Sequence, residues 1–160
     1  MRAGRPCWIS LPAAPQLQSD AVNKQEQQLM QALEGFLTAF RNLDWEPFIA
    51  AFAAEATVFF PFADAPRRAT GAGEIKAIFA PLFASRRSRQ ADASYLRLDP
   101  VYLQITIAGK VALVSFHLHD SAEEQAILCR RTMVWVDEDT QWRILHLHAS
   151  NLPLPNTVEA

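Results

Sequence analysis

Gln-Trp-Arg-Ile-Leu-His-Leu-His-Ala-Ser, residues 141–150, is the stretch of this sequence that decides the fold. Its side chains follow the two-residue period of a β-strand, in which alternate residues project from the same face. The same period extends backward along the chain to about Tyr95. Three earlier strands are predicted by it, at 101–107, 111–120 and 126–136. Because a tight Ala108-Gly109-Lys110 turn and an acidic turn separate these runs, we expect an antiparallel meander.

The first half of the chain has the three- to four-residue period of amphipathic helices. Asn23 and Glu26 have the spacing of a capping box, which predicts a helix start. The apolar stripe of this helix consists of Met30, Leu33, Leu37 and Phe40. Asp44 is suited to cap a second, shorter helix, with Pro47 tolerated in its first turn.

A strand and a third helix are predicted between these helices and the meander. The strand covers 57–62, which is rich in β-branched and aromatic residues and ends in a loop. Helical spacing returns from Ile75 to Phe83, and Pro81 should kink or split this helix because proline lacks an amide proton.

This order of elements, helices first and then a run of strands, predicts an α+β fold. We expect a cone-shaped, curved antiparallel sheet whose one face packs on the N-terminal helices. The domain should span residues 23–153, after a disordered tail over 1–22 and before a C-terminal tail over 154–160. Half of the 160 residues are apolar, which is sufficient for one core.

Composition narrows the possible partners. The formal net charge is −2, so no global field favours nucleic acid or acidic membranes. Cys7 and Cys129 are too few for a disulfide framework, and the prolines near the N-terminus interrupt any secretory apolar run. We therefore predict a cytoplasmic protein without a nucleic-acid or membrane partner.

Two stretches resemble a known superfamily. The segment from Leu43 to Gly71 looks like part of the SnoaL-like and nuclear transport factor 2-like proteins, which include ketosteroid isomerases. The second stretch is similar to the end of the association (hub) domain of calcium/calmodulin-dependent protein kinases; its matching residues are Thr132, Val134, Trp135, Trp142, Ile144, His146, His148 and Ser150. The resemblance implies a cystatin-like roll over about residues 27–153, with a cavity and a homodimer.

The sequence departs from these relatives at the positions of their catalytic and ligand-binding side chains. Phe60 stands where the resemblance places the general base of ketosteroid isomerases, and a phenyl ring cannot take a proton. Phe36 falls at their oxyanion-side tyrosine. Met133 and Ala149 replace the arginines of the hub pocket. Steroid-type isomerisation is therefore not expected, and whether the chain is an enzyme stays open.

All four histidines occur in two His-x-His pairs, His117 with His119 and His146 with His148. Imidazoles two apart on a strand share a face and can chelate zinc, and Glu123 follows the first pair. The 126–136 strand should separate the pairs by about 9–10 Å, which disfavours a four-histidine site. Metal binding stays the less favoured alternative; we predict no metal and no cofactor.

The favoured function is a homodimer that binds a small, partly apolar or acidic molecule in the cone. Arg130 and Arg131 must point to opposite faces of their strand, and a buried arginine would need an anion. The alternative is a non-catalytic oligomerisation module. The candidate pocket residues are Phe36, Phe40, Trp45, Phe60, Tyr102, His117, Arg131, Trp135 and His148.

Overall fold

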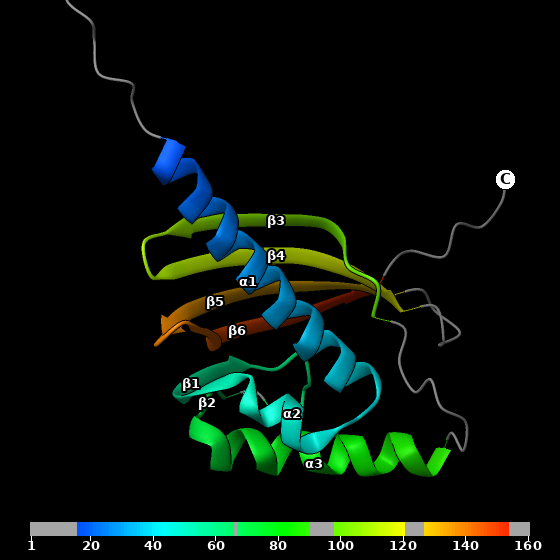
Figure 1. Cartoon of the computed structure of the whole chain (residues 1–160). Coiled ribbons are helices and arrows are strands. Elements are labelled where there is room, and N and C mark those ends of the chain that lie inside the picture. Colours follow the sequence, from blue (N-terminus) through cyan, green and yellow to red (C-terminus); the bar gives the residue numbers. More distant parts are fainter. Residues whose placement is uncertain (1–15, 66, 90–97, 121–126, 154–160) are drawn as a thin grey trace, which may run out of the picture.

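Three helices and six strands form the part of the chain that the computed structural model describes, residues 16–65, 67–89, 98–120 and 127–153. The helices are α1 (Gln16–Arg41), α2 (Trp45–Ala50) and α3 (Gly71–Arg89). The strands are β1 (Phe52–Phe59), β2 (Ala69–Thr70), β3 (Val101–Ala108), β4 (Val111–Asp120), β5 (Ile127–Glu138) and β6 (Gln141–Pro153). They form one sheet in the order β2-β1-β6-β5-β4-β3 (Figure 1). The predicted α+β class is confirmed, and the curved sheet is not closed on itself.

The four long strands β3 to β6 are the predicted antiparallel meander, but β1 joins β6 in parallel. Thr57 pairs with His146 and Phe59 with His148. A parallel pair needs a long crossover connection, and here α3 and four strands, β2 to β5, supply it. The sequence pattern could not reveal this direction, since the hydrophobic period of a strand is the same in either orientation.

Helix α1 begins at Gln16, seven residues before Asn23, so the prediction that Asn23 and Glu26 mark its start is wrong. The residues before Asn23 include the good helix formers Gln16, Leu17, Gln18 and Ala21, and the helix extends past the edge of the sheet (Figure 1). Residues 1–15 of the expected N-terminal tail and all of the expected tail at 154–160 lie outside the described residues.

A buried corner joins α1 to α2. Leu43 has a left-handed backbone, with φ of 55°, and the Asp44 amide donates back to the Ala39 carbonyl over 2.8 Å. Asp44 holds the predicted N-cap position of α2, yet its side chain makes no capping hydrogen bond. Instead Arg87 of α3 lies 3.8 Å from the Asp44 carboxylate and donates to the Leu43 carbonyl over 2.6 Å. The third helix therefore holds the corner in place.

Helix α3 continues through Pro81, so the expected split is not found. Pro81 is exposed, while Phe79 and Phe83 on either side of it are buried in the core. Their packing holds both halves of the helix against the rest of the domain, despite the lost amide hydrogen bond.

The first strand differs from the prediction, since β1 covers Phe52–Phe59 rather than 57–62.

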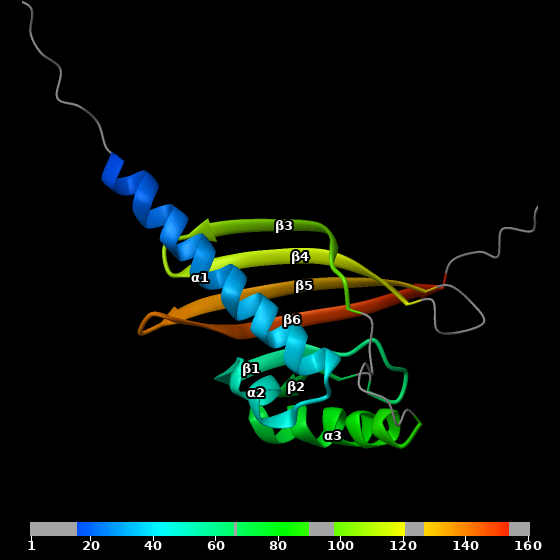
Figure 2. The same ribbon diagram turned by 45° about the vertical axis from the view of Figure 1, so that its right-hand side comes forward.

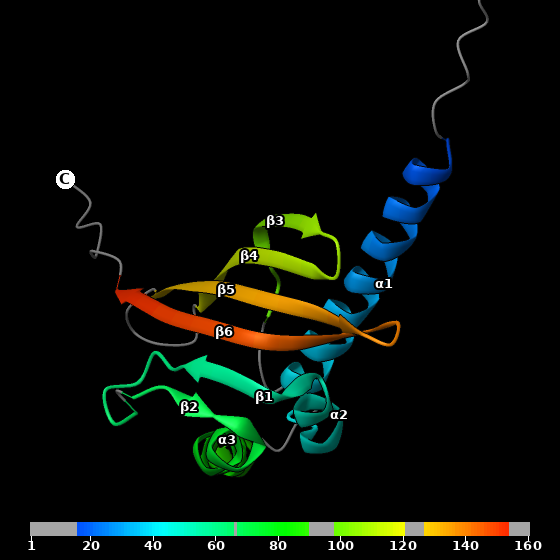
Figure 3. The same ribbon diagram turned by 90° about the vertical axis from the view of Figure 1, so that its left-hand side faces the viewer.

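The core lies between the helices and one face of the sheet, here called the inner face. Figure 2 shows α1 crossing this face of β3 to β6, and Figure 3 shows α3 below β1 and β2. Buried residues alternate along the strands, such as Ala112 and Val114 on β4 and Met133 and Trp135 on β5. Within the described part, no helix covers the opposite, outer face. No helix there has the length and hydropathy to cross a bilayer either.

Leu33 and Met30 of α1 allow a test of this packing. Leu33 is 2% exposed and Met30 is 40% exposed. We expect Leu33→Ala to lower the free energy of unfolding by about 2–5 kcal/mol, because it leaves a cavity under the helix. Met30→Ala should cost under about 1 kcal/mol. Urea denaturation at a fixed protein concentration measures both, and equal losses would contradict this position of α1.

Candidate functional site

The nine candidate pocket residues do not lie together. Four of them, Phe36, Phe40, Phe60 and Trp135, pack between the helices and the inner face. The Phe36 and Trp135 rings meet edge to face at 6.4 Å, and Phe60 meets Phe79 at 4.9 Å. These side chains pack on one another, and we call them the aromatic floor.

Trp45 lies at the margin of this cluster on α2. Its ring is half-buried and meets Phe83 edge to face at 5.8 Å. The Lys76 ammonium lies 5.9 Å from the centre of the same ring, at the distance of a cation–π contact. Trp45 therefore packs between α2 and α3.

Arg131 is the one charged candidate, and it lies on the inner face. Its register partners are Phe116 on β4 and Ala149 on β6, both buried. The Nη1 atom donates to the carbonyls of Arg130 and Ser150 over 2.9 and 3.2 Å and to Asn151 Oδ1 over 3.3 Å. Among the described side chains, no carboxylate lies within ion-pair distance.

Burial lowers the pKa of the Arg131 guanidinium, because desolvation disfavours the charged form. The Cys129 thiol beside it acts in the opposite direction and raises that pKa. Arg131 is thus a cation held mainly by neutral acceptors at the end of an apolar face. Arg130 projects to the outer face and hydrogen-bonds Ser150 Oγ at 3.2 Å, which confirms that the two arginines point apart.

The remaining three candidates, Tyr102, His117 and His148, are on the outer side of the sheet. Tyr102 is 81% exposed, and its ring meets His117 edge to face at 5.7 Å. His148 is exposed and lies 5.6 Å from the Phe59 ring. They are therefore separated from the aromatic floor by the thickness of the sheet.

His146 shares this outer face and was not among the candidates. Its Nδ1 atom lies 2.7 Å from Thr57 Oγ1 of the neighbouring strand, and its ring is 5.8 Å from Phe59. Desolvation lowers the pKa of His146, and His148 and Arg68 add to this by repelling a positive charge. The neutral ring is therefore the favoured form.

The two histidine pairs are separated as expected, because β5 lies between β4 and β6. Over the described residues, no group of three or more His, Cys, Asp or Glu side chains is placed to hold a metal ion. Glu123 and the side chain of His119 lie outside that part, so the metal alternative stays an untested hypothesis.

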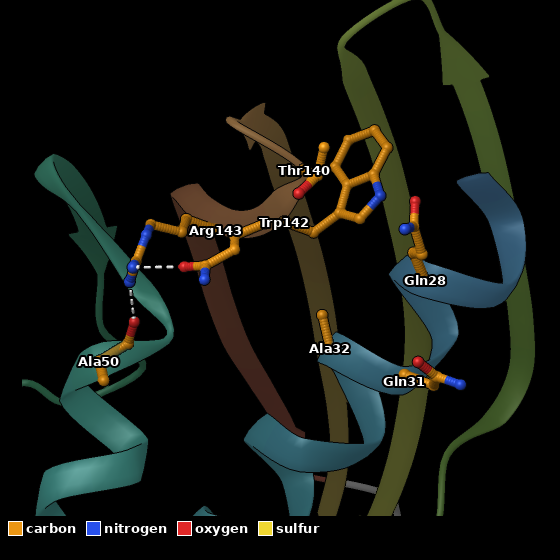
Figure 4. A pocket seen from close by; sticks show the side chains of 8 residues that line it. Gln28, Gln31, Ala32, Ala50, Thr140, Trp142 and Arg143 are labelled. Atoms are coloured by element: carbon orange, nitrogen blue, oxygen red, sulfur yellow. Dashed lines mark hydrogen bonds between the residues drawn. The ribbon is translucent and has the colours of Figure 1, made fainter. Parts of the chain in front are cut away.

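Sequence reasoning also missed a groove between α1 and the β5–β6 hairpin. It has a volume of about 520 Å³ and includes Gln28, Gln31, Thr140, Gln141, Trp142 and Arg143 (Figure 4). These residues come from distant parts of the chain and form no motif. No signal in the sequence could have found them together.

Comparisons with solved structures agree on the fold. An NTF2-like protein of unknown function from Pseudomonas putida KT2440 superimposes with a TM-score of 0.67 at 19% identity, covering 86% of this chain and 93% of its own. The CaMKII hub of S. rosetta gives 0.60 at 19% identity, covering 89% and 100%. The association domain of C. elegans CaMKII gives 0.59 at 17% identity, covering 82% and 98%. At these identities the likeness shows a shared NTF2-like fold.

The family itself is shown by sequence. The SnoaL-like domain profile matches residues 29–155, which is most of the chain. The protein belongs to the SnoaL-like family, and the predicted resemblance is confirmed. A search of curated proteins finds no match.

The pKa of His146 provides a test of the outer-face geometry. Arg68→Gln should raise the pKa of His146 by removing a repelling charge. Arg67→Gln should leave this pKa unchanged, because Arg67 does not contribute to the shift. Titration of the His146 ring protons by NMR measures both variants.

Because the folded-state pKa is the lower one, the unfolded chain binds the proton more readily. The stability contributed by neutral His146 should therefore be present above pH about 6.5 and be lost as the pH falls through the folded-state pKa. His146→Gln should flatten that fall. An unchanged slope of unfolding free energy against pH would contradict the assignment.

Proposed function

We propose that this SnoaL-like chain is an association module that forms a homodimer through the outer face of its sheet. The observation that carries this proposal is the large apolar side chains on a face that the described part leaves uncovered. Leu113 and Val111 of β4 are 47% and 43% exposed, and Leu152 of β6 is 44% exposed. Sheets with such a face commonly pair back to back across a two-fold axis.

The pattern of side chains supports this choice over an uncovered monomer. On β4 the buried inner residues include Ala112, whereas the larger Leu113 points outward. Phe59 of β1, at 40% exposure, extends the same apolar surface to the other side of β6. Two solved structures with this fold are association or hub domains of CaMKII, and that likeness is consistent with a role in assembly.

Leu113→Glu tests the dimer. A two-fold interface would bring two glutamates into a desolvated surface, so we expect association to weaken at least about 100-fold. Met30→Glu, an equally exposed apolar position on α1, should leave the dimer intact. Sedimentation velocity at about 20 µM protein distinguishes the species. A monomeric wild type, or equal dissociation of both variants, would sink the proposal.

A second candidate function is supported by Arg131. We propose that its guanidinium anchors the carboxylate of a small, partly apolar molecule at the inner face. Its hydrogen bonds to oxygen all come from Nη1, and the Cys129 thiol also hydrogen-bonds the guanidinium. A carboxylate pairs best with two adjacent guanidinium N–H groups and would replace some of these neutral acceptors. The neighbouring Phe116 and Ala149 favour an apolar body for such a ligand. Whether the bound molecule then reacts is left open.

Arg130 and Arg131 make a matched pair for the test. Phenylacetate serves as the probe, and 2-phenylethanol as its uncharged counterpart. We expect Arg131→Met to weaken phenylacetate binding at least about tenfold, and Arg130→Met to leave it unchanged because that side chain is on the other face. Isothermal titration calorimetry measures the affinities. Equal effects of the two substitutions, or equal binding of both probes, would exclude this role.

A further inference from the structure

The groove between α1 and the β5–β6 hairpin is independent of both proposed functions. It opens beside the middle of α1, at the hairpin end of β5 and β6, whereas Arg131 lies toward the other end of these strands. Its polar side chains are mainly uncharged: three glutamine amides, Gln28, Gln31 and Gln141, and the Thr140 hydroxyl.

Arg143 is the one charged residue of the groove lining, and its guanidinium is already occupied. It donates to the Ala50 carbonyl and, over 2.9 Å, to Gln141 Oε1. Its Nε atom lies 3.5 Å from the Glu138 carboxylate. The groove therefore offers no unpaired positive charge to an anionic ligand.

Trp142 gives the groove a polar atom without a partner. Trp142 is 5% exposed, and its indole Nε1 is buried with no hydrogen bond to any described residue. Asp137, its direct partner across the hairpin, has a buried carboxyl oxygen in the same condition. An unmet donor and an unmet acceptor each cost free energy in a buried position. A hydroxyl group in the groove can accept from the indole N–H and keep its own proton for another acceptor.

The Gln28 side chain lies beside the indole nitrogen of Trp142 (Figure 4). In Figure 4 the indole nitrogen is on the side of the ring that faces α1 and the Gln28 amide. Gln28 is half-buried and makes no hydrogen bond to any described residue, so rotation of its side chain costs little. Such a rotation would bring the indole N–H into contact with a molecule in the groove.

We propose that this groove binds a neutral polyhydroxylated molecule, a small sugar or polyol. One hydroxyl accepts the hydrogen bond of the Trp142 indole N–H. Further hydroxyls meet the amides of Gln31 and Gln141, which can donate and accept at once. The occupied Arg143 and the nearby carboxyl groups exclude a ligand of negative charge.

The test follows the indole N–H resonances of the four tryptophans in ¹H–¹⁵N spectra of the full chain. The spectrum of Trp142→Phe assigns the reporting resonance. Glucose, N-acetylglucosamine and myo-inositol are titrated to about 50 mM, with glucuronate as the charged counterpart of glucose. At least one neutral probe should shift the Trp142 resonance to saturation. Trp135, whose indole nitrogen is also buried without a partner but lies outside the groove, should not move.

Two glutamines of α1 provide the matched variants. Gln31→Ala removes a groove amide and should weaken the binding of the active probe at least about threefold. Gln27→Ala, at an exposed position outside the groove, should leave it unchanged. Any one of three results overturns the proposal: no neutral probe moves Trp142, glucuronate binds as well as glucose, or the two variants behave alike.

Discussion

The contact between Phe36 and Phe48, with ring centres 5.3 Å apart, connects all parts of the core. Phe48 has no exposed surface, and its ring also meets Phe79 of α3 at 4.7 Å and Phe52 of β1 at 5.5 Å. Phe36 in turn meets Trp135 on the sheet. Three helices and two strands are thus held by rings that share one apolar space. Among the described residues, the charged side chains lie at the end of this space or outside it.

The alternation of side chains along the strands then decides which groups reach which side. Trp135 and Met133 must face the helices, and this puts Arg131 on the same inner face two residues further back. In the neighbouring strands the register sends His117 and His148 outward. The chain therefore separates its buried cation from its histidines, and these groups cannot act on one ligand together.

Much of the fold was predictable because period and turn chemistry are local. The strand periods, the Ala108-Gly109-Lys110 turn and the opposed arginines follow from neighbouring residues alone. The faces of a strand are harder to assign when both carry apolar residues, as with Ala112 inside and Leu113 outside. This is the step that placed His117, Tyr102 and His148 with the inner aromatic residues, whereas the structure has them on the outer face. The parallel entry of β1 and the groove depend on long-range contacts, which no local pattern encodes.

Phe60 shows why family likeness and chemistry separate in this chain. It is 9% exposed and packs on Phe79, at the position where the resemblance to ketosteroid isomerases places a general base. A carboxylate there would be buried among phenyl rings at a large desolvation cost. Phenylalanine removes that cost and joins α3 to β1 instead. Phe60 thus strengthens the core at the position where the resemblance places a catalytic group, and the recognition sites that we propose lie elsewhere, at Arg131, at the groove beside Trp142 and on the outer sheet face.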